Sequence, residues 1–164
     1  MKYLFSAVLF TLCAAAGFGQ SGTKEIDFSV NGISTSSSYR EVIKKLGKPK
    51  REVPSNILNE CTGGYSRTLY YDGLEIELDG DKKMNKSSVV MIKITSTKWK
   101  MSSGIRIGET VASLKQRLGE PAALADGDQK QLVYGLTDAT GPGAVDFDIK
   151  NGKVAVVTLL ATIC

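Results

Sequence analysis

The sequence contains no histidine among its 164 residues. Histidine is the most common general base in enzymes and a frequent ligand of catalytic zinc. Its absence excludes the Ser-His-Asp and Cys-His nucleophile systems and most catalytic zinc sites. The sequence also lacks a phosphate-binding loop and a dinucleotide-binding glycine fingerprint. We therefore expect a protein that is not an enzyme and that needs no cofactor and no metal ion.

An excess of charge of one sign is also missing. The chain has 21 basic and 17 acidic residues, so its net charge is only +4. Proteins that bind nucleic acid usually carry a much stronger positive field. The composition therefore gives no indication of a nucleic-acid partner.

Long hydrophobic runs are absent beyond the first residues. The apolar run Tyr3–Ala16 is too short to span a bilayer, and small residues follow it. This pattern predicts a signal peptide that is cleaved after Gly19, with Gln20 as the new N-terminus and the periplasm or the exterior as the destination. The alternative is an outer-membrane lipoprotein with a lipid on Cys13, although Leu12 stands where a small residue is usual. We favour soluble export and expect no membrane span.

Cysteine is scarce, with three residues in the chain. Cleavage after Gly19 would leave Cys61 and Cys164, and a lone pair in an oxidising compartment usually forms a disulfide. Closing a loop of about 100 residues is worth up to about 4–5 kcal/mol in the chain-entropy model. Two free, buried thiols are the alternative, because sequence does not show proximity.

A repeated pattern is the main feature that the sequence does contain. The pattern Gly32–Pro49 returns without a gap at Gly104–Pro121, 72 residues later. A duplicated unit indicates the architecture of a chain. We therefore predict a signal peptide at 1–19 and repeat units at 20–103 and 104–164 that form one compact domain.

Each copy of the pattern predicts one short helix. Ser38 and Thr110 are the expected N-caps, and Glu41 completes a capping box with Ser38. Gly47 and Gly119 are the expected ends of the two helices. Helices this short are unstable alone in water, so we expect them to pack on a sheet.

Strand and turn signals fill the rest of each unit. Asp72-Gly73 and Asn151-Gly152 predict two-residue hairpin turns, and Arg51–Ser66 is expected to be a loop. The nearly all-apolar segment Val154–Ile163 predicts a strand that is buried on both faces, at the junction of the two units. The expected fold class is α+β: two tandem helix-plus-three-strand units that form a two-layer antiparallel sheet with short helices packed on one face.

The segment Gly104–Pro121 reads Gly-Ile-x-x-Gly-x-Thr-x-x-x-Leu-x-x-x-Leu-Gly-x-Pro. It resembles the repeat of the small outer-membrane-assembly lipoproteins of the SmpA/OmlA type and the similar domain of β-lactamase inhibitory protein. This resemblance implies a non-enzymatic module that binds another protein, as an inhibitor or an immunity protein. A structural or assembly role in the cell envelope is the first alternative. The shared residues are caps and turns, so no partner-contacting residue can be carried over.

Aromatic residues are the remaining candidates for a binding surface, because Tyr and Trp dominate interface hot spots. The candidates are Tyr65, Tyr71, Trp99 and Tyr134. The alternative for each is a packing residue with a polar tip that reaches water.

Two carboxylate pairs are the candidates for the less expected alternative, a small periplasmic enzyme. Glu75 and Glu77 form the first pair, and Asp146 and Asp148 form the second. Residues two apart on a strand share a face, so each pair has a geometry that acid–base catalysis can use. Alternation with apolar residues instead predicts that both pairs lie on the wet side of the sheet.

Overall fold

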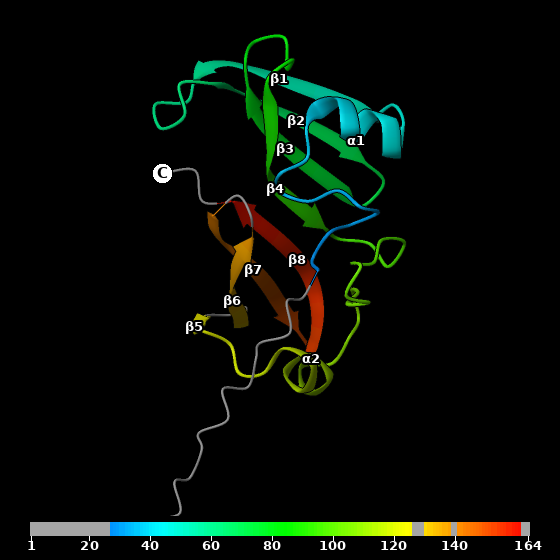
Figure 1. Ribbon diagram of the computed structural model, residues 1–164. Helices are drawn as coiled ribbons and strands as arrows, with labels where there is room; N and C mark the ends of the chain where they lie inside the picture. Colours follow the sequence, from blue (N-terminus) through cyan, green and yellow to red (C-terminus); the bar gives the residue numbers. More distant parts are fainter. Residues whose placement is uncertain (1–26, 126–129, 139–140, 162–164) are drawn as a thin grey trace, which may run out of the picture.

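The computed structural model describes residues 27–125, 130–138 and 141–161 (Figure 1). The expected signal peptide, Cys13 and Cys164 lie outside these ranges, so cleavage, lipidation and the Cys61–Cys164 disulfide stay predictions. Along the described chain the elements are α1 (Tyr39–Leu46), β1 (Arg51–Leu58), β2 (Tyr65–Tyr71), β3 (Leu74–Gly80), β4 (Ser87–Ile94), α2 (Val111–Leu118), β5 (Ala123–Ala125), β6 (Lys130–Asp138), β7 (Gly141–Lys150) and β8 (Lys153–Ala161).

All eight strands belong to one antiparallel sheet with the order β1-β2-β3-β4-β8-β7-β6-β5. Strands β1 to β4 follow one another in space, and so do β5 to β8. The two halves meet where β4 pairs with β8, with Ile92 opposite Leu159 (Figure 1). The prediction that the last strand lies at this junction is therefore confirmed.

The fold class predicted from the sequence is wrong. We expected an α+β protein of two helix-plus-three-strand units, but the described residues form mostly one continuous sheet with two helices of eight residues each. Four strands follow each helix. The strands that were missed are β1, in a segment assigned to a loop, and the three-residue β5.

Strand β1 was missed because it lies at the edge of the sheet. Nearly all of its side chains are exposed, so it lacks the alternation of buried and exposed residues that identifies a half-buried strand. Pro54 also makes this segment unlike a central strand, since proline has no N–H to donate to a sheet ladder. Edge strands tolerate proline, and Pro54 is opposite Arg67 of β2.

The ends of both helices agree with the prediction. Ser38 and Glu41 form the expected capping box on α1, and the Thr110 side chain accepts the Ser113 N–H on α2. The chain leaves both helices through a glycine with positive φ, 77° at Gly47 and 83° at Gly119.

The two predicted hairpin turns are both present, in different conformations. Asn151 and Gly152 have φ of 53° and 72°, as a type I′ turn requires. At Asp72-Gly73 only the glycine has positive φ, 73°, although the hairpin of β2 and β3 pairs in the expected register.

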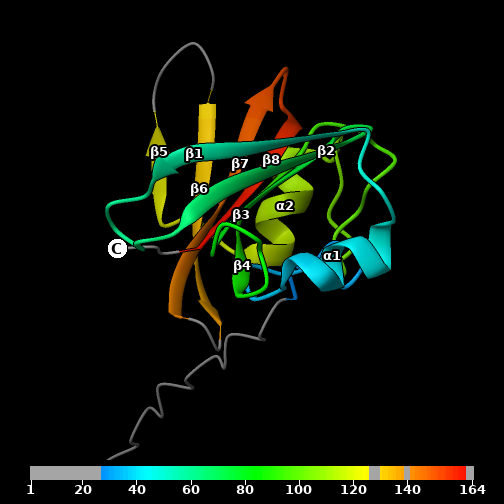
Figure 2. The same cartoon turned by 90° about the horizontal axis from the view of Figure 1, so that it is seen from above.

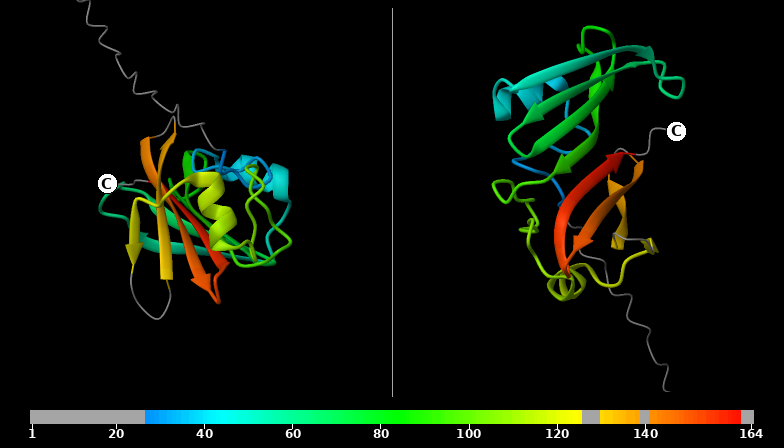
Figure 3. Two further views of the ribbon diagram at one scale, coloured as in Figure 1. Left: turned by 90° about the horizontal axis from the view of Figure 1, so that it is seen from below. Right: turned by 180° about the vertical axis from the view of Figure 1, so that it is seen from behind.

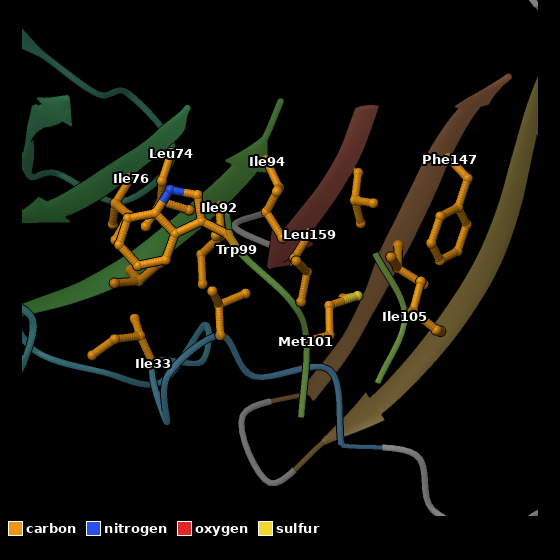
Figure 4. Close-up of a cluster of buried hydrophobic side chains, with 14 of the residues drawn as sticks. Ile33, Leu74, Ile76, Ile92, Ile94, Trp99, Met101, Ile105, Phe147 and Leu159 are labelled. Atoms are coloured by element: carbon orange, nitrogen blue, oxygen red, sulfur yellow. The ribbon is translucent and has the colours of Figure 1, made fainter. Parts of the chain in front are cut away.

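The hydrophobic core lies on one face of the sheet. Strand residues such as Ile76, Ile92 and Phe147 are fully buried there, beneath the connecting segments that carry Ile33 and Ile105 (Figure 4). Both helices lie on this side, and the strand direction turns strongly from β1 to β6 (Figure 2). Among the described residues, no helix is long and apolar enough to cross a membrane.

Candidate functional site

The face of the sheet opposite the core is the main candidate site, and we call it the open face. On β3, Leu74, Ile76 and Leu78 are buried in the core, so Glu75 and Glu77 point to the opposite side. Seen from behind, no described helix crosses the strands (Figure 3). By the same alternation the open face carries Thr68, Tyr70, Glu75, Glu77, Asp79, Met91, Lys93, Gln131, Val133, Ala144, Asp146, Asp148, Val156, Thr158 and Leu160.

Most of these side chains are half-buried. The register places Tyr70, Glu75, Lys93, Thr158 and Asp146 side by side in one row across five strands. The face is therefore a continuous surface that both halves of the sheet share.

Acidic residues dominate the open face. Five of its residues are carboxylates, and Lys93 is its one basic residue. Basic side chains stand at the rim, with Arg51 on β1 and both Lys150 and Lys153 beside the β7–β8 turn. The carboxylates lie on β3 and β7, and the two middle strands between them, β4 and β8, carry Met91, Lys93, Val156, Thr158 and Leu160 on this face.

The two carboxylates on β7, Asp146 and Asp148, repel each other. Burial raises the pKa of Asp146, and the neighbouring charge of Asp148 raises it further. Gln131 Nε2 lies 3.5 Å from Asp146 Oδ2 and 3.4 Å from Asp148 Oδ1. Asp146 Oδ1 is buried without a hydrogen-bond partner. A positively charged group on this face would relieve the repulsion within this pair.

The β3 and β7 carboxylate pairs do not meet. Two strands, β4 and β8, lie between Glu75 and Asp146 in the same row. Three strand spacings of about 4.8 Å separate them by about 14 Å. Paired carboxyl groups of glycosidases are roughly 5–9.5 Å apart, so these two pairs do not combine into such a site.

All four aromatic candidates lie on the core side. Trp99 is 9% exposed, and its Nε1 donates to the Asp72 carbonyl at 2.7 Å. Tyr134 is 7% exposed, and its hydroxyl donates to the Gly119 carbonyl at 3.1 Å. The Tyr71 hydroxyl donates to the Gly47 carbonyl at 3.0 Å, and burial raises the pKa of Tyr71 to about 12.

These aromatic side chains do not form one surface. Tyr71 packs edge to face on Trp99, with 6.5 Å between ring centroids, whereas Tyr134 packs on Phe147 in the other half. The aromatic residue on the open face is Tyr70, whose ring lies 3.9 Å below the Arg51 guanidinium. Alternation along β2 requires neighbouring tyrosines to point to opposite faces, which is the signal that distinguishes Tyr70 from Tyr71.

Tyr65, the fourth candidate, lines a pocket at one end of the sheet. The pocket has a volume of about 820 Å³ and lies between the β1–β2 turn and the β3–β4 loop. Asp79, which no sequence motif marks as a site residue, also lines it. Asp79 is 6% exposed, and its Oδ1 has no hydrogen-bond partner.

Comparison with known proteins shows a similar fold in solved structures but identifies no family. No protein-family model matches the chain, and no curated protein matches it. The fold is similar to part of an extracellular protein that contains an SCP domain from Bacillus anthracis, with a TM-score of 0.50 and 13% identity over 85% of this chain. The chain spans about half of that protein, 49%.

Two further solved structures match at lower TM-scores. A DUF4309 family protein from Bacillus subtilis, YjgB, has a TM-score of 0.47 and 19% identity, with 82% of each chain covered. The uncharacterized protein YfeY from Escherichia coli has a TM-score of 0.48 and 14% identity, with 85% of this chain and 100% of that chain covered.

Proposed function

We propose that the protein is an exported, non-enzymatic binding module, and that a partner protein with a basic surface docks on the open face. The apolar N-terminal run followed by small residues supports export to the periplasm or the exterior. The absence of histidine supports a role without catalysis. The protein whose fold is similar over 85% of this chain is described as extracellular, in agreement with export.

The acidic residues on two strands of the open face carry this proposal. Glu75 and Glu77 on β3 and Asp146 and Asp148 on β7 are half-buried carboxylates, and Lys93 on β4 is the one lysine between them, in a chain of net charge +4. Complementary charge steers two proteins together and selects between partners. A basic protein surface matches this region, whereas an acidic partner would be repelled by it.

Binding assays with a charge-reversed face test the proposal. Glu75→Lys combined with Glu77→Lys reverses two charges on half-buried positions of β3. We expect this double variant to bind at least about tenfold more weakly to any specific partner recovered from the cell envelope, because like charges across an interface cost several kcal/mol. The measurement is the affinity of the purified partner for the wild-type protein and for the variant, at low and high salt.

Charge reversal away from the face is the matched control. Glu60→Lys combined with Glu120→Lys changes the net charge by the same amount at exposed positions that are not on the open face. The proposal requires this control to retain the partner. Equal binding by both double variants would refute it, and so would a partner whose contact surface is acidic.

The identity of the partner separates the inhibitor role from the envelope role. One enzyme or toxin that is inactivated in a stoichiometric complex supports an inhibitor or immunity protein. Recovery of outer-membrane assembly components, together with a lipid on Cys13, would instead assign the protein to the cell envelope.

A further inference from the structure

The middle of the open face carries apolar side chains on the two strands that join the halves of the sheet. Met91 of β4 lies directly opposite Leu160 of β8. Val156 lies on the same face of β8, four residues earlier in the chain. All three side chains are half-buried, so part of each remains accessible. We call Met91, Val156 and Leu160 the apolar stripe.

Carboxylates border the apolar stripe on both sides. Glu77 of β3 lies opposite Met91, and Asp148 of β7 lies opposite Val156. Glu75 and Asp146 lie two residues along on the same two strands. The side chains of all four acidic residues are half-buried. The open face is therefore amphipathic across its strands, with an apolar middle between two acidic borders.

Lys93 is the one basic residue between the two borders. It lies opposite Glu75 on one side and Thr158 on the other. A lysine stem can lie along a surface while its ammonium group turns toward a neighbouring opposite charge. The four half-buried carboxylates and this lysine leave a net charge of three negative units around the apolar stripe.

The dimensions of this arrangement match one α-helix. The carboxylate-bearing strands β3 and β7 are three strand spacings apart, about 14 Å, and a helix with its side chains is about 10–12 Å wide. From Val156 to Leu160 the stripe extends over four residues of strand, about 13 Å, which equals about two and a half turns of helix. A second sheet would cover the carboxylates as well as the stripe, and burial of unpaired charges is costly.

We propose that the part of the partner that docks on the open face is an amphipathic α-helix with basic residues along both sides of its apolar stripe. This inference rests on the docking role proposed above and adds the form of the partner. Apolar residues at positions i, i+3, i+4 and i+7 of the helix pack on Met91, Val156 and Leu160. Lysine or arginine side chains beside them extend to the carboxylates of β3 and β7, where the charges are complementary.

Synthetic peptides added to the full protein test this inference. All three are about 15 residues long, or about four helical turns. The first has leucines at i, i+3, i+4 and i+7 and lysines on both sides of them. The second has the same composition in an order that forms no apolar face, and the third has glutamate in place of every lysine. Binding is measured by titration, and helix formation by circular dichroism.

We expect the first peptide to bind saturably, to become helical on binding and to shift the backbone amides of β4 and β8. The reordered peptide should bind at least about tenfold more weakly, because it cannot bury its leucines together. Equal affinity for these two peptides would overturn the inference, since charge alone would then explain binding. Absence of binding by the first peptide, or equal binding of the acidic peptide, would also overturn it.

Uncharged substitutions within the apolar stripe sharpen the test. Met91→Gln and Leu160→Gln remove apolar contacts without changing the charge, and each should weaken binding of the first peptide about tenfold. Leu58→Gln is the matched control, because Leu58 is 50% exposed on β1 and lies outside the stripe. Unchanged affinity in both stripe variants would refute the helix. The comparison of peptides uses the wild-type protein, so it decides the question even where a variant does not fold.

The docking role and the helix fail separately. A specific partner that is lost with Glu75→Lys and Glu77→Lys but kept by Met91→Gln and Leu160→Gln would leave the docking role intact and refute the helix. Equal binding of the first peptide by the wild-type protein and by the charge-reversed double variant would refute the basic borders of the helix. Loss of the partner and of the first peptide in both sets of variants supports the two proposals together.

Discussion

The two halves of the sheet anchor their helices with the same kind of contact, but the tyrosines that make it are not related by the 72-residue spacing of the repeat. The Tyr71 hydroxyl donates to the Gly47 carbonyl at 3.0 Å, and the Tyr134 hydroxyl donates to the Gly119 carbonyl at 3.1 Å. The two glycines are 72 residues apart, but the two tyrosines are not. In both halves, a tyrosine hydroxyl thus satisfies a carbonyl at the C-terminal end of the helix, although the two tyrosines are not at equivalent positions.

A second shared contact holds the segment before each helix. Lys45 Nζ donates to the Gly32 carbonyl, and Arg117 Nη1 donates to the Ser103 carbonyl at 2.8 Å. Lys45 and Arg117 occupy equivalent positions of the repeated pattern. Both helices thus use a basic residue of the last turn to fix the chain that precedes them.

The halves differ at their outer edges. Strand β1 has eight residues, and β5 at the opposite edge has three. The exposed large hydrophobic residues of the described chain are Val53, Ile57 and Leu58, all on β1. The contacts that anchor the helices are therefore alike in both halves, whereas the edge strands β1 and β5 differ.

The largest expected effect concerns the predicted bridge between the halves. If Cys61 and Cys164 are bonded, Cys61→Ser should lower the free energy of unfolding by up to about 4–5 kcal/mol. Cys164→Ser should have the same effect, and the double substitution should add nothing further. Denaturant unfolding measures all three variants, and two alkylatable thiols in the wild-type protein without reductant would refute the bridge.

The helix contacts with the core come next. Val42 and Leu114 occupy equivalent positions of α1 and α2, and both are fully buried. Leu114→Ala should cost about 2–5 kcal/mol, because it leaves a cavity in the core. Val42→Ala removes less apolar volume and should cost about 1 kcal/mol less. Equal unfolding midpoints for the two variants would show that the helices are not packed equivalently.

Substitutions at the helix N-termini should destabilise α1 more than α2, the reverse of the order expected for the core substitutions. Ser38→Ala breaks a capping box, whereas Thr110→Ala removes one hydrogen bond, so α1 should lose more within the range of about 0.5–2 kcal/mol. Hydrogen bonds from Ser38 lower the pKa of Glu41. This lowered pKa stabilises the fold at pH values above the pKa that Glu41 has in the unfolded chain. The contribution disappears as the pH falls through the pKa of Glu41 in the folded protein. The difference between Ser38→Ala and wild type should therefore shrink in acid.

The tyrosine anchors give a smaller effect with its own pH dependence. Tyr71→Phe and Tyr134→Phe should each cost about 0.5–1.5 kcal/mol, because each removes one hydrogen bond to a helix carbonyl. Burial raises the pKa of both tyrosines, to about 12 for Tyr71. The unfolded chain ionises first, near pH 10, so this contribution is complete below pH 10 and is lost as the pH rises through the folded pKa. Wild-type stability should fall more steeply than that of Tyr71→Phe over this alkaline interval.

The smallest expected effect is at the exposed edge. Ile57 is 81% exposed, so Ile57→Lys should change the free energy of unfolding by no more than about 0.5 kcal/mol. Lysine on an edge strand opposes pairing with another chain. Light scattering should show less self-association than for the wild-type protein at high concentration. A large loss of stability would mean that β1 packs against more than β2.

The local signals in the sequence determined caps and turns well, because each depends on a few neighbouring residues. Ser38 with Glu41, and Asn151 with Gly152, adopt the expected conformations. The final strand also lies at the junction as predicted. The expectation that it is buried on both faces is wrong, because Val156, Thr158 and Leu160 are half-buried on the open face.

The number of strands and the location of the pocket could not be predicted in the same way. An edge strand such as β1 has no buried face to impose a pattern. The pocket depends on Asp79 meeting the turn at Asn59, 20 residues earlier in the chain. The position of Asp79 near the end of an alternating strand does not indicate that Asn59 is its partner. The open face was anticipated only as the wet side of the strands, because register across the sheet decides which carboxylates become neighbours.

The position of β8 has a consequence for the order of assembly. It is the last strand along the chain, yet it hydrogen-bonds to β4 on one side and to β7 on the other. During synthesis, the first four strands emerge without the neighbour that joins them to the other half. The complete sheet cannot close until β8 has been made, and contacts this distant in sequence form slowly.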